Sequence, residues 1–90
     1  MSDEATTRLR DRIAECDRAI LAAVNARLQL VAELKAHKER TGAGFLDRAQ
    51  EERLVDALLA ANDGPLSEAG VRELFEQVLA LTKRELARSA

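Results

Sequence analysis

A stretch with helical periodicity and no glycine or proline runs from Thr7 to about Arg40, and it limits the possible folds more than any other feature. Its apolar residues recur with helical spacing, so we expect one helix of roughly 50 Å at about 1.5 Å per residue. A globular chain of 90 residues has a radius of gyration of only about 12 Å. Because its own chain cannot cover such a helix, we expect an intertwined homodimer in which the long helix pairs with its copy.

The apolar stripe of this helix contains cations. Two neighbouring columns of the heptad register mix charged and aliphatic residues: Ile13, Ile20, Arg27 and Leu34 in one, and Arg10, Asp17, Val24, Val31 and Lys38 in the other. A helix that needs only solubility keeps Arg and Lys on its hydrated face, so Arg10, Arg27 and Lys38 are candidates for a binding site. The alternative is that their long side chains reach water or pair with acids across the dimer seam.

Two breaks divide the remaining chain into shorter helices. The glycines of segment 41–44 allow a reversal, under which Phe45 and Leu46 are expected to tuck. We expect a second helix over about 47–61, capped by Asp47, and a third over about 68–88, capped by Ser67 after the stop at 62–65. Together with a flexible leader over residues 1–6, and Thr6 or Thr7 as the first cap, this predicts a single all-α domain over residues 1–90.

Composition agrees with an all-helical fold and excludes several functions. Ala, Leu, Glu and Arg dominate, and only two aromatic residues are present, so aliphatic side chains must fill the core. A net charge of −2 with interleaved acids and bases argues against nucleic acid as a partner. No apolar run approaches the roughly 20 residues that span a bilayer, and the polar start is not a signal peptide, so a cytoplasmic location is expected.

The cysteine and histidine content argues against a metal site. Cys16 and His37 are the sole residues of their types, and two such ligands do not make a metal cluster. On the apolar stripe, Cys16 is predicted to be a small buried hydrophobe, and His37 is predicted to be exposed.

The spacing of the cations indicates what they could bind. Arg27 and Lys38 are eleven residues apart, which is three turns, so they face the same way about 16 Å apart along the axis. Arg10 lies about 25 Å from Arg27 and cannot share a ligand with it in one chain, but Arg10 of the partner subunit could enter from the far end. Guanidinium groups bind carboxylates in bidentate fashion, so the predicted ligand is a small dicarboxylate.

Polar residues of the shorter helices complete this predicted pocket. Asp47 and Glu51 should lie near Lys38 after the turn, and Thr82 falls on the face of Phe75 and Val78. A carboxylate such as Glu51 would accept a hydrogen bond from a ligand hydroxyl or amine. No nucleophile has an adjacent base, so an enzyme of this kind would hold and polarise its substrate. In the simpler alternatives, Asp47 is only a cap, Glu51 a solvated first-turn acid and Thr82 a core-edge residue.

These residues resemble a known family. The segments L-R-D-R-I (9–13), A-R-L-Q-L-V (26–31), K-A-H-K (35–38) and D-R-A-Q-E (47–51) resemble the all-helical class of chorismate mutases. The later segments N-D-G-P-L and L-F-E-Q-V-L resemble mutase domains that are fused to an aldol-type synthase of the same pathway. The resemblance implies an isomerase of aromatic amino acid biosynthesis, in which an intertwined dimer rearranges chorismate to prephenate without a cofactor.

The resemblance also implies roles for individual residues. Arg27 and Arg10 of the partner subunit would hold the two carboxylates, and Lys38 would donate to the ether oxygen as the C–O bond breaks. Glu51 would accept from the ring hydroxyl, while Asp47 and Thr82 would line the site. Such a site restrains a flexible ligand in its reactive conformer and stabilises charge as it develops.

Two positions depart from the family's pattern. Gln50 stands where an Arg is usual, and Leu86 stands where a second donor to the ether oxygen is usual. Arg48, Arg53, Lys83 and Arg84 are nearby cations that could substitute. The departures leave open a 4-amino-4-deoxychorismate mutase, an isochorismate-pyruvate lyase, or a non-catalytic helical dimerisation or regulatory module.

Overall fold

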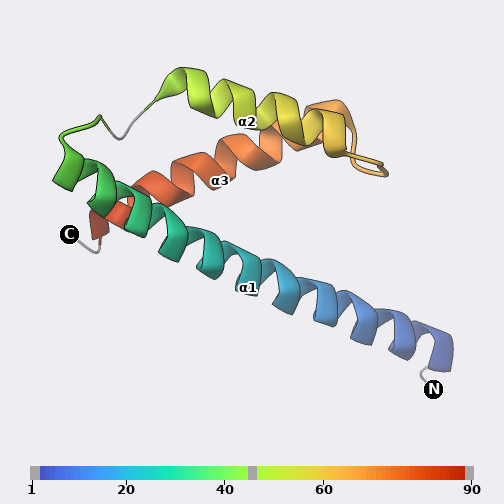
Figure 1. Ribbon diagram of the computed structural model, residues 1–90. Helices are drawn as coiled ribbons and strands as arrows, with labels where there is room; N and C mark the ends of the chain where they lie inside the picture. Colours follow the sequence, from blue (N-terminus) through green and yellow to red (C-terminus); the bar gives the residue numbers. More distant parts are fainter. Residues whose placement is uncertain (1–2, 45–46, 89–90) are drawn as a thin grey trace. The chain divides into compact units, whose positions relative to one another are not determined.

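The computed structural model describes residues 3–44 and 47–88, and all regular structure within these ranges is helical (Figure 1). Helix α1 spans Glu4–Thr41, α2 spans Arg48–Ala61 and α3 spans Glu68–Arg88. The predicted order of one long and two shorter helices is therefore confirmed. Phe45 and Leu46, which were expected to tuck under the turn, lie outside the described residues.

Helix α1 begins at Glu4, earlier than predicted, because Asp3 caps it. The Asp3 carboxylate accepts hydrogen bonds from the Ala5 amide and the Thr6 hydroxyl, both at 3.0 Å. An Asp side chain at this position satisfies amides that have no partner within the helix. The predicted cap at Thr6 or Thr7 was wrong, and residues 4–6 belong to the helix and not to a leader.

Helix α1 ends at a glycine in the left-handed conformation. Gly42 has φ of +76°, and the amides of Gly42 and Ala43 donate to the carbonyls of Glu39 and Lys38 at 3.4 and 3.0 Å. This pair of bonds is the Schellman arrangement, in which glycine supplies a backbone conformation that other residues adopt at a cost. The predicted glycine break is confirmed.

The caps of α2 and α3 are those that the sequence predicts. The Asp47 carboxylate accepts from the Gln50 amide at 3.2 Å, and the Ser67 hydroxyl accepts from the Gly70 amide at 3.0 Å. In the connection between the helices, the Asn62 side chain bonds to the Gly64 amide and to the Leu66 carbonyl. These local bonds explain why both helix boundaries could be predicted.

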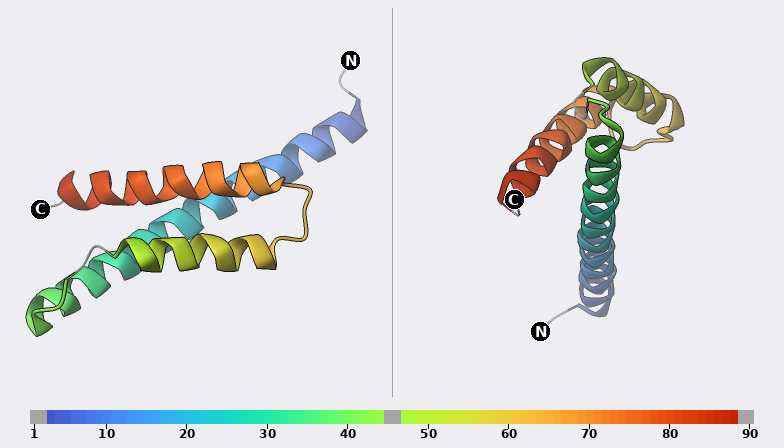
Figure 2. Two further views of the ribbon diagram at one scale, coloured as in Figure 1. Left: turned by 90° about the horizontal axis from the view of Figure 1, so that it is seen from above. Right: turned by 60° about the vertical axis from the view of Figure 1, so that its left-hand side comes forward.

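Contacts between Cα atoms divide the chain into two units, Met1–Glu33 and Leu34–Ala90, which are described separately. In the second unit, α2 and α3 pack against each other and run in opposite directions (Figures 1 and 2). Half-buried aliphatic and aromatic side chains on these two helices include Leu54, Val55, Leu58, Phe75, Val78 and Leu79. Val71, 4% exposed, and Thr82, 8% exposed, are the most buried of the described side chains.

The first unit is a helical segment with an exposed apolar stripe. Leu9, Ile13 and Ile20 are between 57% and 61% exposed, and Cys16 between them is also exposed. The expectation that Cys16 is buried is therefore not met within a single chain. No helix in the described ranges combines the length and hydrophobicity needed to cross a membrane.

Candidate active site

The three candidate cations lie on α1 but differ in burial. Arg10 is exposed, whereas Arg27 and Lys38 are half-buried. Arg10 and Arg27 belong to the first unit and Lys38 belongs to the second. Lys38 forms no ion pair among the residues that the structure describes, so its ammonium is available to an anion. Its place in the last turn of α1 also favours a positive charge, because helix carbonyls converge there.

The first turn of α2 holds a network built on Arg53. The Arg53 guanidinium donates to the Gln50 side-chain oxygen from Nε at 3.1 Å and from Nη2 at 2.8 Å. The same Nη2 lies 3.9 Å from Asp47 Oδ2. Asp47 therefore both caps α2 and helps to hold Arg53. Arg53 thus places a guanidinium group beside Gln50.

Glu51 is paired across the α2–α3 contact. Lys83 Nζ lies 3.0 Å from Glu51 Oε1, and the side chains are 49% and 31% exposed, respectively. Exposed ion pairs contribute at most about 1 kcal/mol to stability, so this pair matters more for the charge and orientation of Glu51 than for folding. Lys83 is thus the nearby cation that reaches a candidate site residue on another helix.

Thr82 and Leu86 occupy one face of α3, one turn apart. Thr82 is buried and its hydroxyl donates to the Val78 carbonyl at 2.7 Å, which uses the hydroxyl proton within the helix. Leu86 is half-buried. A Thr hydroxyl that donates to its own helix still presents oxygen lone pairs to a ligand. Leu86 contributes apolar surface to this face.

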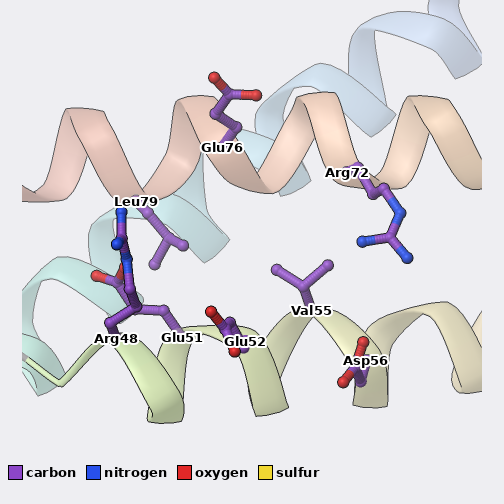
Figure 3. Close-up of a pocket in the computed structure, with 8 residues that line it drawn as sticks. All are labelled: Arg48, Glu51, Glu52, Val55, Asp56, Arg72, Glu76 and Leu79. Atoms are coloured by element: carbon purple, nitrogen blue, oxygen red, sulfur yellow. The ribbon is translucent and has the colours of Figure 1, made fainter.

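An open groove of about 540 Å³ lies between α2 and α3 (Figure 3). Its lining consists of Arg48, Glu51, Glu52, Val55, Asp56, Arg72, Glu76 and Leu79. Val55 and Leu79 point toward the opposite helix, and Arg72 points toward the side of α2 that carries Asp56 (Figure 3). Four carboxylates against two guanidinium groups do not suit a dianion, and Glu51 is the sole candidate residue in the lining. We therefore do not assign the dicarboxylate site to this groove.

The structure brings together part of the predicted site. The α2–α3 contact places Glu51 against Lys83, the residue that follows Thr82. Gln50 and Asp47 are joined by Arg53 at the start of α2, next to Glu51. The meeting of Arg10, Arg27 and Lys38 in one pocket stays a prediction.

The roles of Arg53 and Lys83 were missed by reasoning from the sequence, which treated them as two of four equivalent cations. For Arg53, the spacing of three residues from Gln50 was a usable signal, because such residues are neighbours on a helix. For Lys83 no comparable signal exists, since which α3 residue faces Glu51 depends on how the two helices pack.

Comparisons with known proteins find a family and similar solved structures. The chorismate mutase type II family matches residues 9–86. Chorismate mutase form I from Thermus thermophilus is similar with a TM-score of 0.83 and 27% identity, over 87% of this chain and 98% of that chain. Form II from the same organism has a TM-score of 0.84 and 26% identity, over 89% of this chain and 91% of that chain. A search of curated protein sequences finds no match.

Proposed function

This chain belongs to the chorismate mutase type II family, and we propose that two copies of it form the pockets in which chorismate rearranges to prephenate. Family membership makes the chain an isomerase of aromatic amino acid biosynthesis. One observation carries the proposal: the matched segment, residues 9–86, includes every candidate residue from Arg10 to Leu86.

We assign the binding of the two carboxylates to Arg27 and to Arg10 of the partner subunit. Guanidinium groups form paired hydrogen bonds with carboxylates and hold them in a defined direction. Two such anchors would restrain the flexible enolpyruvyl group of chorismate over its ring. Restraint of this kind removes much of the entropy cost of reaching the transition state.

Lys38 would stabilise the reaction itself. The rearrangement breaks a C–O bond, and negative charge develops on the ether oxygen as that bond lengthens. A fixed ammonium that meets this charge binds the transition state better than the ground state. Lys38 is half-buried and has no ion pair among the described residues, which supports this assignment.

The remaining candidates would shape the ring end of the pocket. Glu51 would accept the hydrogen bond of the ring hydroxyl, and Thr82 and Leu86 would line the wall formed by α3. Asp47 and Gln50, held by Arg53, would close the start of α2. The rearrangement transfers no proton, so none of these groups has to act as an acid or a base.

A second copy of the chain would complete each pocket. The support is the exposed apolar stripe of α1, where Ile13 is 60% and Ile20 is 61% exposed. Leu30 and Leu34 are also exposed farther along the helix. Burial of such side chains is worth roughly 1.5 to 3 kcal/mol each, so a paired α1 would gain substantial stability. The cytoplasmic location stays a prediction.

The test is turnover of chorismate by variants of α1. Arg27→Met and Lys38→Met are each expected to lower kcat/KM by about 10² to 10³, the usual cost of losing one such donor. Matched controls are Arg18→Met and Arg40→Met, which remove exposed cations on roughly the opposite face of the helix from Arg27 and Lys38. Full turnover by both site variants, with the secondary structure intact, would contradict the proposal.

A further inference from the structure

The ion pair between Glu51 and Lys83 bears on which ring substituent the site accepts. We propose that Lys83 makes the site select a ring hydroxyl over a ring ammonium, because Lys83 offsets the charge of Glu51. The inference rests on the proposed function, in which Glu51 faces the substrate ring. It makes Lys83 a specificity-determining residue, although Lys83 acts through Glu51.

The geometry leaves Glu51 able to serve one neutral donor. Lys83 Nζ lies 3.0 Å from Glu51 Oε1. No side chain among the described residues forms an ion pair with Glu51 Oε2. The Glu51 side chain is 31% exposed, so Oε2 is accessible. A carboxylate oxygen can accept a hydrogen bond from a hydroxyl or from an ammonium. The ability to accept a hydrogen bond therefore does not distinguish a ring hydroxyl from a ring ammonium, and the distinction depends on charge.

The charge around Glu51 favours a neutral donor. A lone carboxylate would bind an ammonium more strongly than a hydroxyl, because charge-assisted hydrogen bonds are the stronger ones. With Lys83 already on the carboxylate, a ring ammonium would be a second cation on a single negative charge. The groove that Glu51 lines holds Arg48 and Arg72 together with three further carboxylates (Figure 3), so Lys83, which contacts Glu51 directly, is the cation that sets this penalty. Such a like-charge contact penalises the amino substrate.

The other nearby cations are not arranged for this role. Arg53 bonds to Gln50 and lies near Asp47, so its charge is committed within α2. Arg84 is exposed on α3 and forms no ion pair among the described residues. Arg84 is therefore a matched control for Lys83, because its removal changes the net charge equally without changing the partner of Glu51.

The experiment compares kcat/KM on chorismate and on 4-amino-4-deoxychorismate for the wild type, Lys83→Met and Arg84→Met. The wild type is expected to prefer chorismate, and Lys83→Met should reduce this preference about tenfold or more by removing the like-charge contact. Arg84→Met should keep the wild-type preference. The informative quantity is the ratio of kcat/KM on chorismate to kcat/KM on 4-amino-4-deoxychorismate, because a loss of folded protein lowers both values by the same factor.

Two further variants separate specificity from structure. Lys83→Arg keeps the cation and should retain the wild-type preference, whereas Glu51→Gln, which leaves the Lys83 cation without its counter-charge, should not weaken the preference for chorismate. An unchanged preference in Lys83→Met with chorismate turnover retained would overturn the inference but not the proposed function. Failure of both Lys83→Met and Lys83→Gln to fold would assign a structural role and also overturn it. A wild type that turns over neither substrate would remove the proposed function and this inference together.

Discussion

Single residues of this chain combine structural and functional duties. Asp47 caps α2 through the Gln50 amide and lies 3.9 Å from Arg53, while it is also a candidate for the site. Glu51 sits in the first turn of α2, where a negative charge is favourable, and pairs with Lys83 on α3. Simple explanations of such residues, as caps or first-turn acids, are therefore true alongside a proposed role in the site.

The two duties of Asp47 can be separated by choice of substitution. Asp47→Ala is expected to lower the free energy of unfolding by about 1 kcal/mol, since it removes the acceptor for the Gln50 amide. Asp47→Ser keeps a capping oxygen and should retain most of that stability, although it loses the ion pair with Arg53. Urea denaturation at a single protein concentration measures both.

Chorismate turnover then reports on the second duty. If Asp47 lines the pocket, Asp47→Ser should reduce kcat/KM even though its stability is close to that of the wild type. Equal turnover by Asp47→Ser and the wild type would limit Asp47 to its capping role.

At the scale of elements, helix boundaries are set by short polar and glycine segments. Asp3, Asp47 and Ser67 begin the three helices through side-chain acceptors. Gly42 ends α1 in a conformation that disfavours side chains. Because each signal acts within a few residues, the boundaries do not depend on how the helices pack.

The turn after α1 offers a paired test of glycine. Gly42→Ala is expected to cost about 1 to 2 kcal/mol, because φ is +76° and an L-residue is strained there. No atom lies within 4 Å of an added Cβ, so backbone strain is the sole cost. Gly44 has the same open surroundings and a φ outside the left-handed region.

Gly44→Ala is therefore the control, and it should be neutral or slightly stabilising because it restricts the unfolded chain. The midpoints of thermal unfolding for the two variants provide the comparison. A Gly42→Ala variant as stable as Gly44→Ala would show that the turn adopts a different backbone conformation.

At the scale of the whole molecule, the single chain buries little apolar surface. Val71, 4% exposed, is the most buried hydrophobic residue among the described residues, while six large aliphatic side chains of α1 are exposed. The proposed pairing with a second copy of α1 would bury these side chains and thereby stabilise the fold.

Mixing of variants tests whether two chains share each pocket. Arg10→Ala and Arg27→Ala homodimers should each be inactive, because each would lack one carboxylate anchor in both pockets. After joint unfolding and refolding in equal amounts, half of the dimers would be mixed and would hold one intact pocket of two. Activity should therefore recover to about a quarter of the wild-type value.

The control for this experiment mixes the two variants without unfolding, which should leave them inactive unless the subunits exchange. Sedimentation equilibrium checks that both variants are dimers. No recovery after refolding of dimeric, inactive variants would mean that Arg10 and Arg27 of one chain serve the same pocket, whereas full activity of Arg10→Ala alone would mean that Arg10 has no role.

The sequence by itself determined the helices and the class of the protein. The signals for the three helices are local ones: uninterrupted helical periodicity, caps and glycine stops. The observed boundaries differ from the predicted ones mainly at the start of α1, because the cap is Asp3 and not Thr6 or Thr7. Cation spacing along α1 is likewise a property of one helix. It was enough to propose a dicarboxylate site and to find the family that the comparisons also find.

The tertiary structure alone decided which side chains meet between helices. The pairing of Glu51 with Lys83 depends on how α2 and α3 pack, and the sequence offers Arg84 as an equally good partner one residue later. One residue on a helix turns the side chain by about 100°, so the packing selects a single candidate. The packing thus identifies Lys83 as the partner of Glu51, and this contact is the basis of the proposed preference for a ring hydroxyl.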